Sequence, residues 1–402
     1  MQRTISSNWI LFSLAISAFA IGSTEFISVG LLPLLTQSFG ISLAQGGSTV
    51  SIYAAGITVG APVLALITNR WNRKRLLIAI MVTFLVGNLL AALAPTFGIL
   101  LAGRVIAAVA HGIFMAIASL IAADVVAPQK RASAIAVMFT GLTLATVTGV
   151  PLGTFIGETL GWRASFGFLL ILGTIGLITN ALLVPKDLPL PQPTSIKGIW
   201  RILKQPQLLL ILIITALGYG ATFPVYTYLT PILSQHMGWS SSAIVVILVF
   251  YGIAVAIGNT LGGRFANRRP LPAIMKMFVG LAVALFLVRL TVNLHVWGLL
   301  AVVAMGLFAF MNVPGLQLYI VQLAEAYTPN EVSLASALNI SAFNIGIILG
   351  SGLGGQAVAQ DQLVNTPWLG IGMLVLGVGV AAILQRMEQR QGQRDLRHQN
   401  AK

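Results

Sequence analysis

The 402-residue chain contains no cysteine, which excludes disulfide bonds, thiolate metal sites and cysteine-based catalysis. Charged residues make up only 8% of the sequence, against roughly 25% in an average soluble domain. Acidic residues are the scarcest, with 9 Asp and Glu against 23 Lys and Arg. Hydrophobic residues account for 57% of the chain, more than a soluble core of this size can bury. The composition therefore predicts an integral membrane protein.

The apolar residues form long runs. The 59 residues between Lys204 and Arg264 contain no Lys, Arg, Asp or Glu, which is enough for two membrane spans of about 20 residues each. These runs, together with turn and charge signals, predict an all-α integral membrane protein with twelve transmembrane helices. The expected helices cover residues 9–32, 46–68, 76–94, 98–124, 133–157, 164–184, 208–232, 243–264, 272–293, 297–321, 333–358 and 367–385. The first lacks a small-residue cleavage pattern, so we expect it to be retained as a span.

A polar segment divides the twelve helices into two sets of six. It contains five prolines and the basic residues Lys186, Lys197, Arg201 and Lys204. We therefore expect a six-helix bundle at 1–184, a cytoplasmic linker at 185–206, a second six-helix bundle at 207–385 and a cytoplasmic tail at 386–402.

A short pattern occurs at matching places in the two halves. Gly60 is followed by Asn69 and a basic run, and Gly258 is followed by Asn267 and a second basic run. The two asparagines are 198 residues apart in the 402-residue chain. This duplication predicts two pseudo-symmetric bundles, each with a basic turn after its second helix.

The positive charge is concentrated on one side of the predicted membrane. If the N-terminus is cytoplasmic, 20 of the 23 Lys and Arg residues fall in inward-facing segments, and the exceptions are Arg104, Arg163 and Arg289. This distribution follows the positive-inside rule and predicts that both termini are cytoplasmic. The net charge of +14 therefore indicates orientation and contact with anionic lipid, and no nucleic-acid partner is expected.

The predicted helix at 133–157 carries a glycine and proline pattern. Its members are Gly141, Gly149, Pro151, Gly153 and Gly157. Small residues four apart allow membrane helices to approach closely, so packing alone accounts for the last three glycines. Pro151 removes a backbone hydrogen bond and predicts a bend. The combination resembles the antiporter motif of proton-coupled exporters, G-x-x-x-x-x-x-x-G-x-P-x-x-G.

The basic turn after the second predicted helix resembles the loop signature of the major facilitator superfamily, G-x-x-x-D-R-x-G-R-R. Arg70, Arg73 and Lys74 keep its basic residues, whereas both of its glycines and its acid are replaced, by Ala65, Asn72 and Asn69. In that family the acid helps to latch the cytoplasmic gate. Because the acid is replaced here, we expect Arg73 to pair with Asp124, at the cytoplasmic end of the fourth helix. The simpler alternative is a cytoplasmic loop that merely attracts basic residues.

The whole chain resembles a major facilitator transporter of the drug:proton antiporter branch, close to its arabinose-efflux-permease-like and sugar-efflux-like members. Residues 22–33, Arg104 with His111, residues 226–229 and residues 339–344 carry this likeness. It implies two six-helix bundles that rock about a midplane site in a bacterial cytoplasmic (inner) membrane. The implied partners are a small-molecule substrate, protons and membrane lipids, with a monomeric protein and no cofactor beyond the proton gradient.

Two charges lie inside predicted spans at similar depth. A charge at mid-bilayer costs about 2.5–3.5 kcal/mol on insertion scales, so we expect Glu25 and Arg104 to form a pair. The pair is either a static ion pair or a proton-exchange site, because burial disfavours the carboxylate while Arg104 favours it. His111 lies two helical turns after Arg104 on the same face. It is either a hydrogen-bonded packing residue or a second proton carrier.

Polar and aromatic residues on the helices expected to face the central cavity form a candidate solute site. Its members are Phe26, Tyr53, Phe223, Tyr226, Tyr228, Met311, Asn312, Gln317, Asn339 and Asn344. Taken singly, each is explained by packing or by interhelical hydrogen bonding. Together they imply an amphipathic cavity with few fixed charges, suited to neutral or weakly polar solutes. Pro224 and Pro231 favour a bent or broken gate helix at 208–232.

The sequence contains no Walker loop, zinc-ligand spacing or nucleophile triad, so we expect neither an enzyme nor a metal site, and we expect an ion gradient to supply the energy. The preferred reading is export of a drug-like solute by proton antiport. A sugar or nucleoside exporter would instead use the Asn, Gln and Tyr residues for hydroxyl recognition. A uniporter or importer of the same fold is a third possibility. A non-transporting sensor would need a signalling domain, which the tail after Leu384 does not supply.

Overall fold

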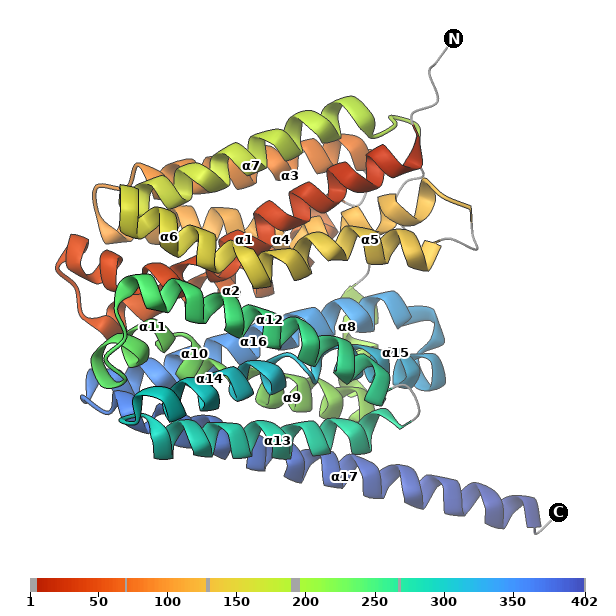
Figure 1. Cartoon of the computed structure of the whole chain (residues 1–402). Coiled ribbons are helices and arrows are strands. Elements are labelled where there is room, and N and C mark those ends of the chain that lie inside the picture. Colours follow the sequence, from red (N-terminus) through yellow and green to blue (C-terminus); the bar gives the residue numbers. More distant parts are fainter. Residues whose placement is uncertain (1–5, 69–70, 128–130, 189–195, 267–268, 401–402) are drawn as a thin grey trace.

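The computed structural model describes residues 6–68, 71–127, 131–188, 196–266 and 269–400. Within these ranges the regular structure is helical throughout and contains no strand. Helices α1 to α7 form one layer, and α9 to α17 form a second layer beside it (Figure 1). The two helical bundles predicted from the sequence are therefore visible in the arrangement of the helices.

The first bundle begins at Ser7. Its elements are α1 (Ser7–Phe39), α2 (Leu43–Ile67), α3 (Arg73–Ala92), α4 (Phe97–Asp124), α5 (Arg131–Leu144), the π-helical turn η2 (Ala145–Gly149), α6 (Val150–Leu160) and α7 (Trp162–Leu183). Local signals set several of these boundaries. Ser42 and Gln45 form a capping box at the start of α2. Gly40 and Gly161 have positive φ angles, of 62° and 87°, and end α1 and α6.

The linker contains a short helix, α8 (Ile196–Lys204). The second bundle follows with α9 (Pro206–Gly220), α10 (Phe223–Tyr226), α11 (Leu229–Pro231), the π-helical turn η3 (Ile232–His236), α12 (Ser241–Ala266), α13 (Pro270–Thr291), α14 (His295–Ala309), α15 (Val313–Tyr327), the 3-10 turn η4 (Pro329–Glu331), α16 (Val332–Ala359), the 3-10 turn η5 (Leu363–Asn365) and α17 (Thr366–Asn400). The predicted helix at 208–232 is broken into α9, α10 and α11, as Pro224 and Pro231 led us to expect.

Eleven segments of the described residues are long and apolar enough to cross a membrane, and each coincides with a predicted helix. The remaining predicted helix, 46–68, is present as α2 but is not among the eleven. Several side chains in the second half of α2 lie outside the described residues. The helix packs against α4 and α16.

The predicted repeat extends to side-chain packing. Gly60 of α2 packs against Val109 of α4, and Gly258 of α12 packs against Leu307 of α14. The two glycines are 198 residues apart, and so are their two partners. The bundles also meet in a repeated way, since α2 contacts α16 while α12 contacts η2 and α6. The second and fifth helices of each bundle therefore contact the fifth and second helices of the other.

The glycines of the fifth predicted helix pack against α1 along its length. The contacts join Gly141 to Ala15, Gly149 to Ser23, Gly153 to Ile27 and Gly157 to Leu31. Every pair is separated by 126 residues, so the two helices keep one parallel register from end to end. Pro151 follows η2, and this wider turn accommodates the backbone hydrogen bond that proline cannot donate. We call this set of contacts the α1 seam.

Close packing on α16 leads to a test with a matched control. A Cβ atom on Gly350 would collide with the main-chain oxygen of Gly220, whereas one on Gly352 would meet open space. We therefore expect Gly350→Ala to destabilise the protein by about 1–3 kcal/mol, because the backbone of α9 must move. Gly352→Ala should be neutral or slightly stabilising. Thermal unfolding of the purified variants in detergent measures both, and equal shifts would contradict the packing described here.

Hydrogen bonds join the two bundles at the end remote from both termini. The N- and C-termini lie at one end of the molecule (Figure 1). Towards the other end, the Thr230 hydroxyl donates to the main-chain oxygen of Val29 over 2.8 Å, and the hydroxyls of Ser51 and Ser351 are 2.7 Å apart. Tyr228 packs against Gly47 in the same region. The bundles are thus fastened together at the remote end in this conformation.

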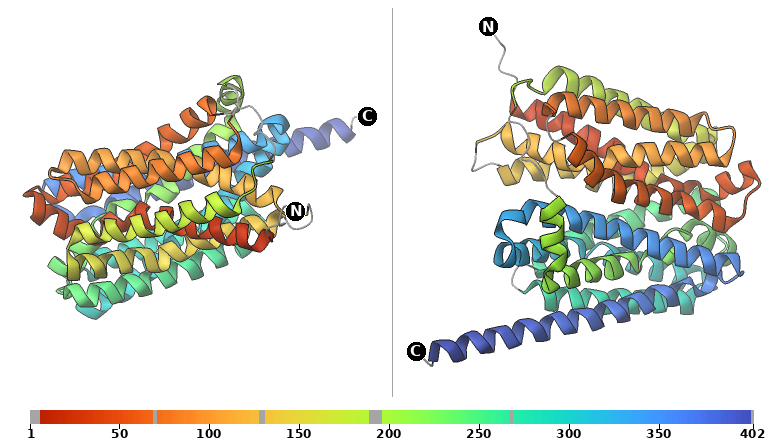
Figure 2. Two further views of the ribbon diagram at one scale, coloured as in Figure 1. Left: turned by 90° about the horizontal axis from the view of Figure 1, so that it is seen from above. Right: turned by 180° about the vertical axis from the view of Figure 1, so that it is seen from behind.

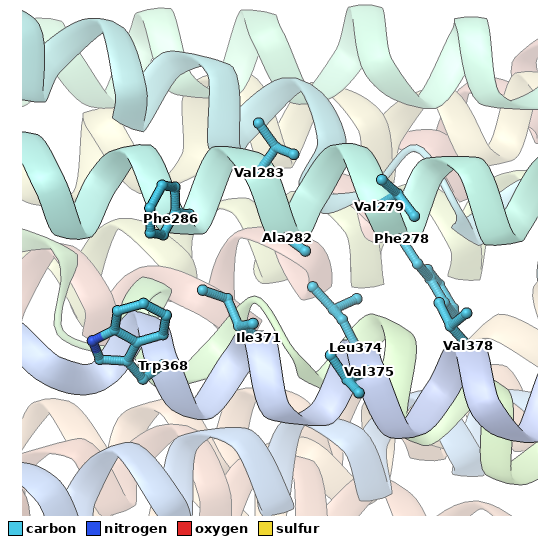
Figure 3. A pocket seen from close by; sticks show the side chains of 10 residues that line it. All are labelled: Phe278, Val279, Ala282, Val283, Phe286, Trp368, Ile371, Leu374, Val375 and Val378. Atoms are coloured by element: carbon cyan, nitrogen blue, oxygen red, sulfur yellow. The ribbon is translucent and has the colours of Figure 1, made fainter.

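An apolar groove of about 400 Å³ runs between α13 and α17 (Figure 3). Its lining residues are Phe278, Val279, Ala282, Val283, Phe286, Trp368, Ile371, Leu374, Val375 and Val378. Several of them are largely exposed, including Val279, Val283 and Val375. The lining includes no charged, hydroxyl or amide side chain, so the groove has the character of a lipid-facing surface and is not assigned as the solute site.

Candidate functional site

Arg104 of α4 is the largest fully buried side chain among the described residues, with 1% of its surface exposed. Its Nη1 donates to the main-chain oxygen of Thr24, and its Nη2 donates to the main-chain oxygens of Glu25 and Thr49 over 2.9 and 3.4 Å. The guanidinium carbon also lies 4.1 Å from the ring centroid of Tyr53. Arg104 therefore ties α4 to α1 and α2 through main-chain acceptors and an aromatic face.

The expected ion pair between Glu25 and Arg104 is not formed. Arg104 binds the main-chain oxygen of Glu25, and among the described residues the ion pairs are Arg73–Asp124 and Arg201–Glu331. The Glu25 carboxyl group is half-buried, and no hydrogen bond reaches it from the described residues. It lies within electrostatic range of Arg104, Tyr219 and Tyr226. The two terminal nitrogens of the guanidinium are directed at three carbonyl oxygens, while Arg104 Nε has no hydrogen-bond partner among the described residues.

His111 is linked to Arg104 through Tyr53. The Tyr53 hydroxyl lies 3.3 Å from His111 Nδ1, and both side chains are buried. Tyr53 therefore contacts Arg104 with its ring face and His111 with its hydroxyl group. Sequence spacing placed His111 on the face of Arg104, and the structure brings the two together. Tyr53 was expected in the solute cavity and instead lies between these two residues of α4.

Seven aromatic side chains form a continuous cluster next to Glu25. The aromatic cluster consists of Phe26, Tyr219, Phe223, Tyr226, Tyr251, Phe310 and Phe343. Ring centroids are 5.7 Å apart for Phe26 and Tyr226 and 5.3 Å for the stacked pair Tyr226 and Tyr251. Phe26 is the one member of the cluster that belongs to the first bundle. Its ring is therefore packed against aromatic side chains of the second bundle.

Sequence reasoning found three of these rings and missed four. Phe26, Phe223 and Tyr226 were expected, whereas Tyr219, Tyr251, Phe310 and Phe343 were not. Spacing could have found Tyr219, which precedes Phe223 by four residues and so lies on the same helix face. Phe310 could also have been found, because it precedes the selected pair Met311 and Asn312.

A chain of buried and half-buried amides and hydroxyls connects three helices of the second bundle. Thr215 of α9 donates to Asn339 Oδ1 over 2.7 Å, and Asn339 Nδ2 donates to Gln317 Oε1 over 2.9 Å. Gln317 Nε2 in turn donates to the Ser336 hydroxyl over 2.6 Å. The predicted solute residues Gln317 and Asn339 therefore hold α9, α15 and α16 together in this conformation.

The remaining predicted solute residues are also buried. Met311 is 5% exposed, and its main-chain oxygen packs against Gly262. Asn312 and Asn344 use their amide nitrogens to bond main-chain oxygens of their own segments. Their Oδ1 atoms have no hydrogen-bond partner among the described residues, and neither has the Tyr228 hydroxyl. These atoms are therefore available to form hydrogen bonds with a bound solute.

The predicted contact between Arg73 and Asp124 is present as an ion pair at the start of α3 and the end of α4. Asn72 caps α3 and also donates to the main-chain oxygen of Lys186 over 2.7 Å. Because Arg73 and Asp124 both belong to the first bundle, their pair does not join the two bundles here. Lys74 lies half-buried beside them. The other two predicted gate residues, Asn69 and Arg70, lie outside the described residues.

Comparison with known proteins agrees with this architecture. The family description "Major Facilitator Superfamily" matches residues 14–351. An uncharacterized MFS-type transporter of Bacillus subtilis, YtbD, is 51% identical over 384 residues, covering 95% of this chain and 97% of that protein. The inner membrane transport protein YdhP of Escherichia coli K12 is 36% identical over 352 residues, covering 88% of this chain and 89% of that protein.

Solved structures support the same fold. A bacterial homolog of the human lysosomal transporter Spinster, in an inward-facing and occupied conformation, aligns with a TM-score of 0.73 at 17% identity, covering 94% of this chain and 97% of that one. The human organic anion transporter MFSD10 aligns with a TM-score of 0.67, covering 93% of this chain and 99% of that one. The chain therefore belongs to the Major Facilitator Superfamily, a non-enzymatic class of multi-pass membrane transporters.

Proposed function

We propose that the protein exports a small neutral or amphipathic, drug-like solute in exchange for protons, as the drug:proton antiporter branch does. The observation that carries the proposal is the Glu25 carboxyl group, which is half-buried and has no hydrogen-bond or ion-pair partner among the described residues. An unpaired carboxylate inside a membrane span is costly, so this group favours the protonated form when solvent is withdrawn.

Arg104 supplies the opposing influence. Its charge lies within electrostatic range of Glu25, while its hydrogen bonds go to main-chain oxygens. The carboxylate is therefore stabilised electrostatically without being locked into a direct ion pair. We propose that Glu25 takes up a proton when the site opens outward and releases it when the site opens inward. His111, reached through Tyr53, is the proposed second carrier.

The proposed solute site lies between Glu25 and the second bundle. The aromatic cluster offers planar apolar faces, and Asn312, Asn344 and Tyr251 offer polar atoms that have no hydrogen-bond partner in the described part of the chain. The rings favour an amphipathic solute. The free amide oxygens support the alternative of a sugar or nucleoside, whose hydroxyl groups would donate to them. Gln317 and Asn339 join this site only if their interhelical bonds open during transport.

We propose that the protein lies in a bacterial cytoplasmic (inner) membrane with both termini inside. The clustering of basic residues near the terminal end supports this orientation, and the name of the relative YdhP supports the membrane. With this orientation, the hydrogen bonds at the remote end would close the outward side and leave the inward side to open. The Arg73–Asp124 pair would keep α3 and α4 together while the protein changes between its outward-open and inward-open conformations. Other contacts would form the cytoplasmic gate.

Inverted membrane vesicles with an imposed pH gradient test the proposed function. Drugs, sugars and nucleosides are screened for accumulation that also dissipates the gradient. Accumulation of a drug-like solute that an uncoupler abolishes is the expected result, and a sugar or nucleoside in its place would select the alternative. Transport that continues after the gradient is collapsed would indicate a uniporter. If no compound is transported and none dissipates the gradient, the antiport proposal fails.

A further inference from the structure

Helix α8 runs across the direction of the long helices, at the end of the molecule where both termini lie (Figure 2). It packs against α9 and α16. Arg201 of α8 also forms an ion pair with Glu331, the residue immediately before α16. The linker helix is therefore attached to the second bundle. Because the long helices span the membrane, α8 lies roughly parallel to the membrane plane at its surface.

The faces of α8 differ sharply in character. Ile202 is fully buried, and Ile199 and Leu203 are half-buried against the second bundle. The opposite face presents Lys197, Trp200, Arg201 and Lys204, at the i, i+3, i+4 and i+7 spacing of a single helical stripe. These four side chains line an open groove of about 510 Å³.

The exposed face carries positive charge that the described residues neutralise only in part. Among those residues Glu331 is the acidic partner of Arg201, and the side chain of Arg201 is still 61% exposed. No ion pair reaches Lys197 or Lys204 from the described residues. Trp200 is 60% exposed beside them, and an exposed indole among lysines is typical of helices that lie at the membrane interface.

We propose that the stripe formed by Lys197, Trp200, Arg201 and Lys204 binds the headgroups of anionic phospholipids. The ammonium groups bind the lipid phosphate, and the indole of Trp200 lies at the level where headgroups meet acyl chains. Since α8 is fixed to the start of α16, bound lipid holds this end of the second bundle at the membrane surface. Lipid binding at α8 depends on neither proton coupling nor the direction of transport, so its test is independent of the test of the proposed function.

Lipid binding by the full-length protein provides the test. Wild type, the double variant Lys197→Gln/Lys204→Gln and the control double variant Arg386→Gln/Arg390→Gln are titrated with phosphatidylglycerol and with phosphatidylcholine, and bound lipid is counted by native mass spectrometry. Arg386 and Arg390 are exposed cations of α17 in the predicted cytoplasmic tail, so both doubles remove the same charge. Each cation near an anionic surface contributes about 1 kcal/mol, so we expect the Lys197/Lys204 variant to bind phosphatidylglycerol roughly 30-fold more weakly.

The control should bind phosphatidylglycerol as wild type does, and phosphatidylcholine binding should be the same in all three proteins. An equal loss of phosphatidylglycerol binding in both double variants would mean that the positive surface as a whole attracts anionic lipid and that α8 forms no specific site. That result would overturn the proposal. Unchanged phosphatidylglycerol binding in the Lys197/Lys204 variant would overturn it as well. A second measurement is the quenching of the protein's tryptophan fluorescence by lipids brominated near the headgroup. The quenched fraction should be smaller in the Trp200→Phe variant than in wild type. An unchanged fraction would contradict the proposed position of the indole.

Discussion

Replacing Glu25 with glutamine should abolish accumulation driven by a pH gradient while leaving solute exchange intact. Glutamine has nearly the shape of a protonated glutamate but cannot exchange a proton. Each pH unit supplies about 1.4 kcal/mol per proton, or a tenfold accumulation ratio. With about two units imposed and one proton per solute, a ratio of roughly 100 should fall to 1 in the variant. Uptake of solute into inverted vesicles under a pH gradient measures the loss of accumulation. Exchange of solute across the membrane without a pH gradient measures the transport activity that we expect to remain.

Glu158→Gln is the matched control for this substitution. Glu158 is an exposed residue near the end of α6, remote from the termini, and its replacement removes the same charge outside the candidate site. The control should accumulate solute as wild type does. Full accumulation by the Glu25 variant would show that another group carries the proton, and His111 would then be the next residue to replace. Loss of exchange as well as accumulation would point to a structural role for Glu25.

Arg104→Met should reduce coupled transport by about two orders of magnitude. The methionine leaves the carboxylate form of Glu25 without a nearby positive charge. An unsupported charge inside the membrane costs about 2.5–3.5 kcal/mol, which corresponds to a carboxylate population roughly 100-fold smaller. Arg104→Lys retains the charge but loses the fork that reaches Thr24, Glu25 and Thr49, so it should keep part of the activity.

The control for Arg104 is Arg163→Met. Arg163 also combines a hydrogen bond to a main-chain oxygen, that of Ala94, with a position 4.2 Å from an aromatic ring, that of Trp162, but it is exposed at the remote end. Its replacement should leave the rate of proton-driven uptake in vesicles close to that of wild type. Two results would contradict the proposal that the charge of Arg104 stabilises the Glu25 carboxylate. One is an equal loss of activity in both methionine variants, and the other is an Arg104→Lys variant as inactive as Arg104→Met.

The helices and the repeat were predictable because they depend on properties that the chain shows directly. Apolar length identifies a span, and the matching positions of Gly60 and Gly258 anticipated the matching contacts with Val109 and Leu307. The pair Arg73–Asp124 was predictable for a similar reason. Both charges stand at helix ends on the same side, where acidic residues are few and few other partners are available.

The interior of the site was harder to predict. Similar depth suggested a Glu25–Arg104 ion pair, but depth does not specify which way a side chain leaves its helix, and main-chain oxygens compete for the guanidinium. Tyr251 was missed because α12 is apolar on nearly every face, so its periodicity does not indicate the side that faces Phe26 and Tyr226. Asn339 and Gln317 were recognised as polar residues in spans, yet sequence alone does not show that they bond each other.

The α1 seam restricts how Glu25 can move. Glu25 lies between two of its contacts, Ser23 with Gly149 and Ile27 with Gly153, where a shift of α1 along α6 would drive side chains into the opposing backbone. We therefore expect the main chain at Glu25 to move only when the first bundle moves as a unit. The carboxyl group would then keep a fixed place in the first bundle, whichever side of the membrane supplies the proton. Among its neighbours, the aromatic side chains of the second bundle would be the ones that move relative to it.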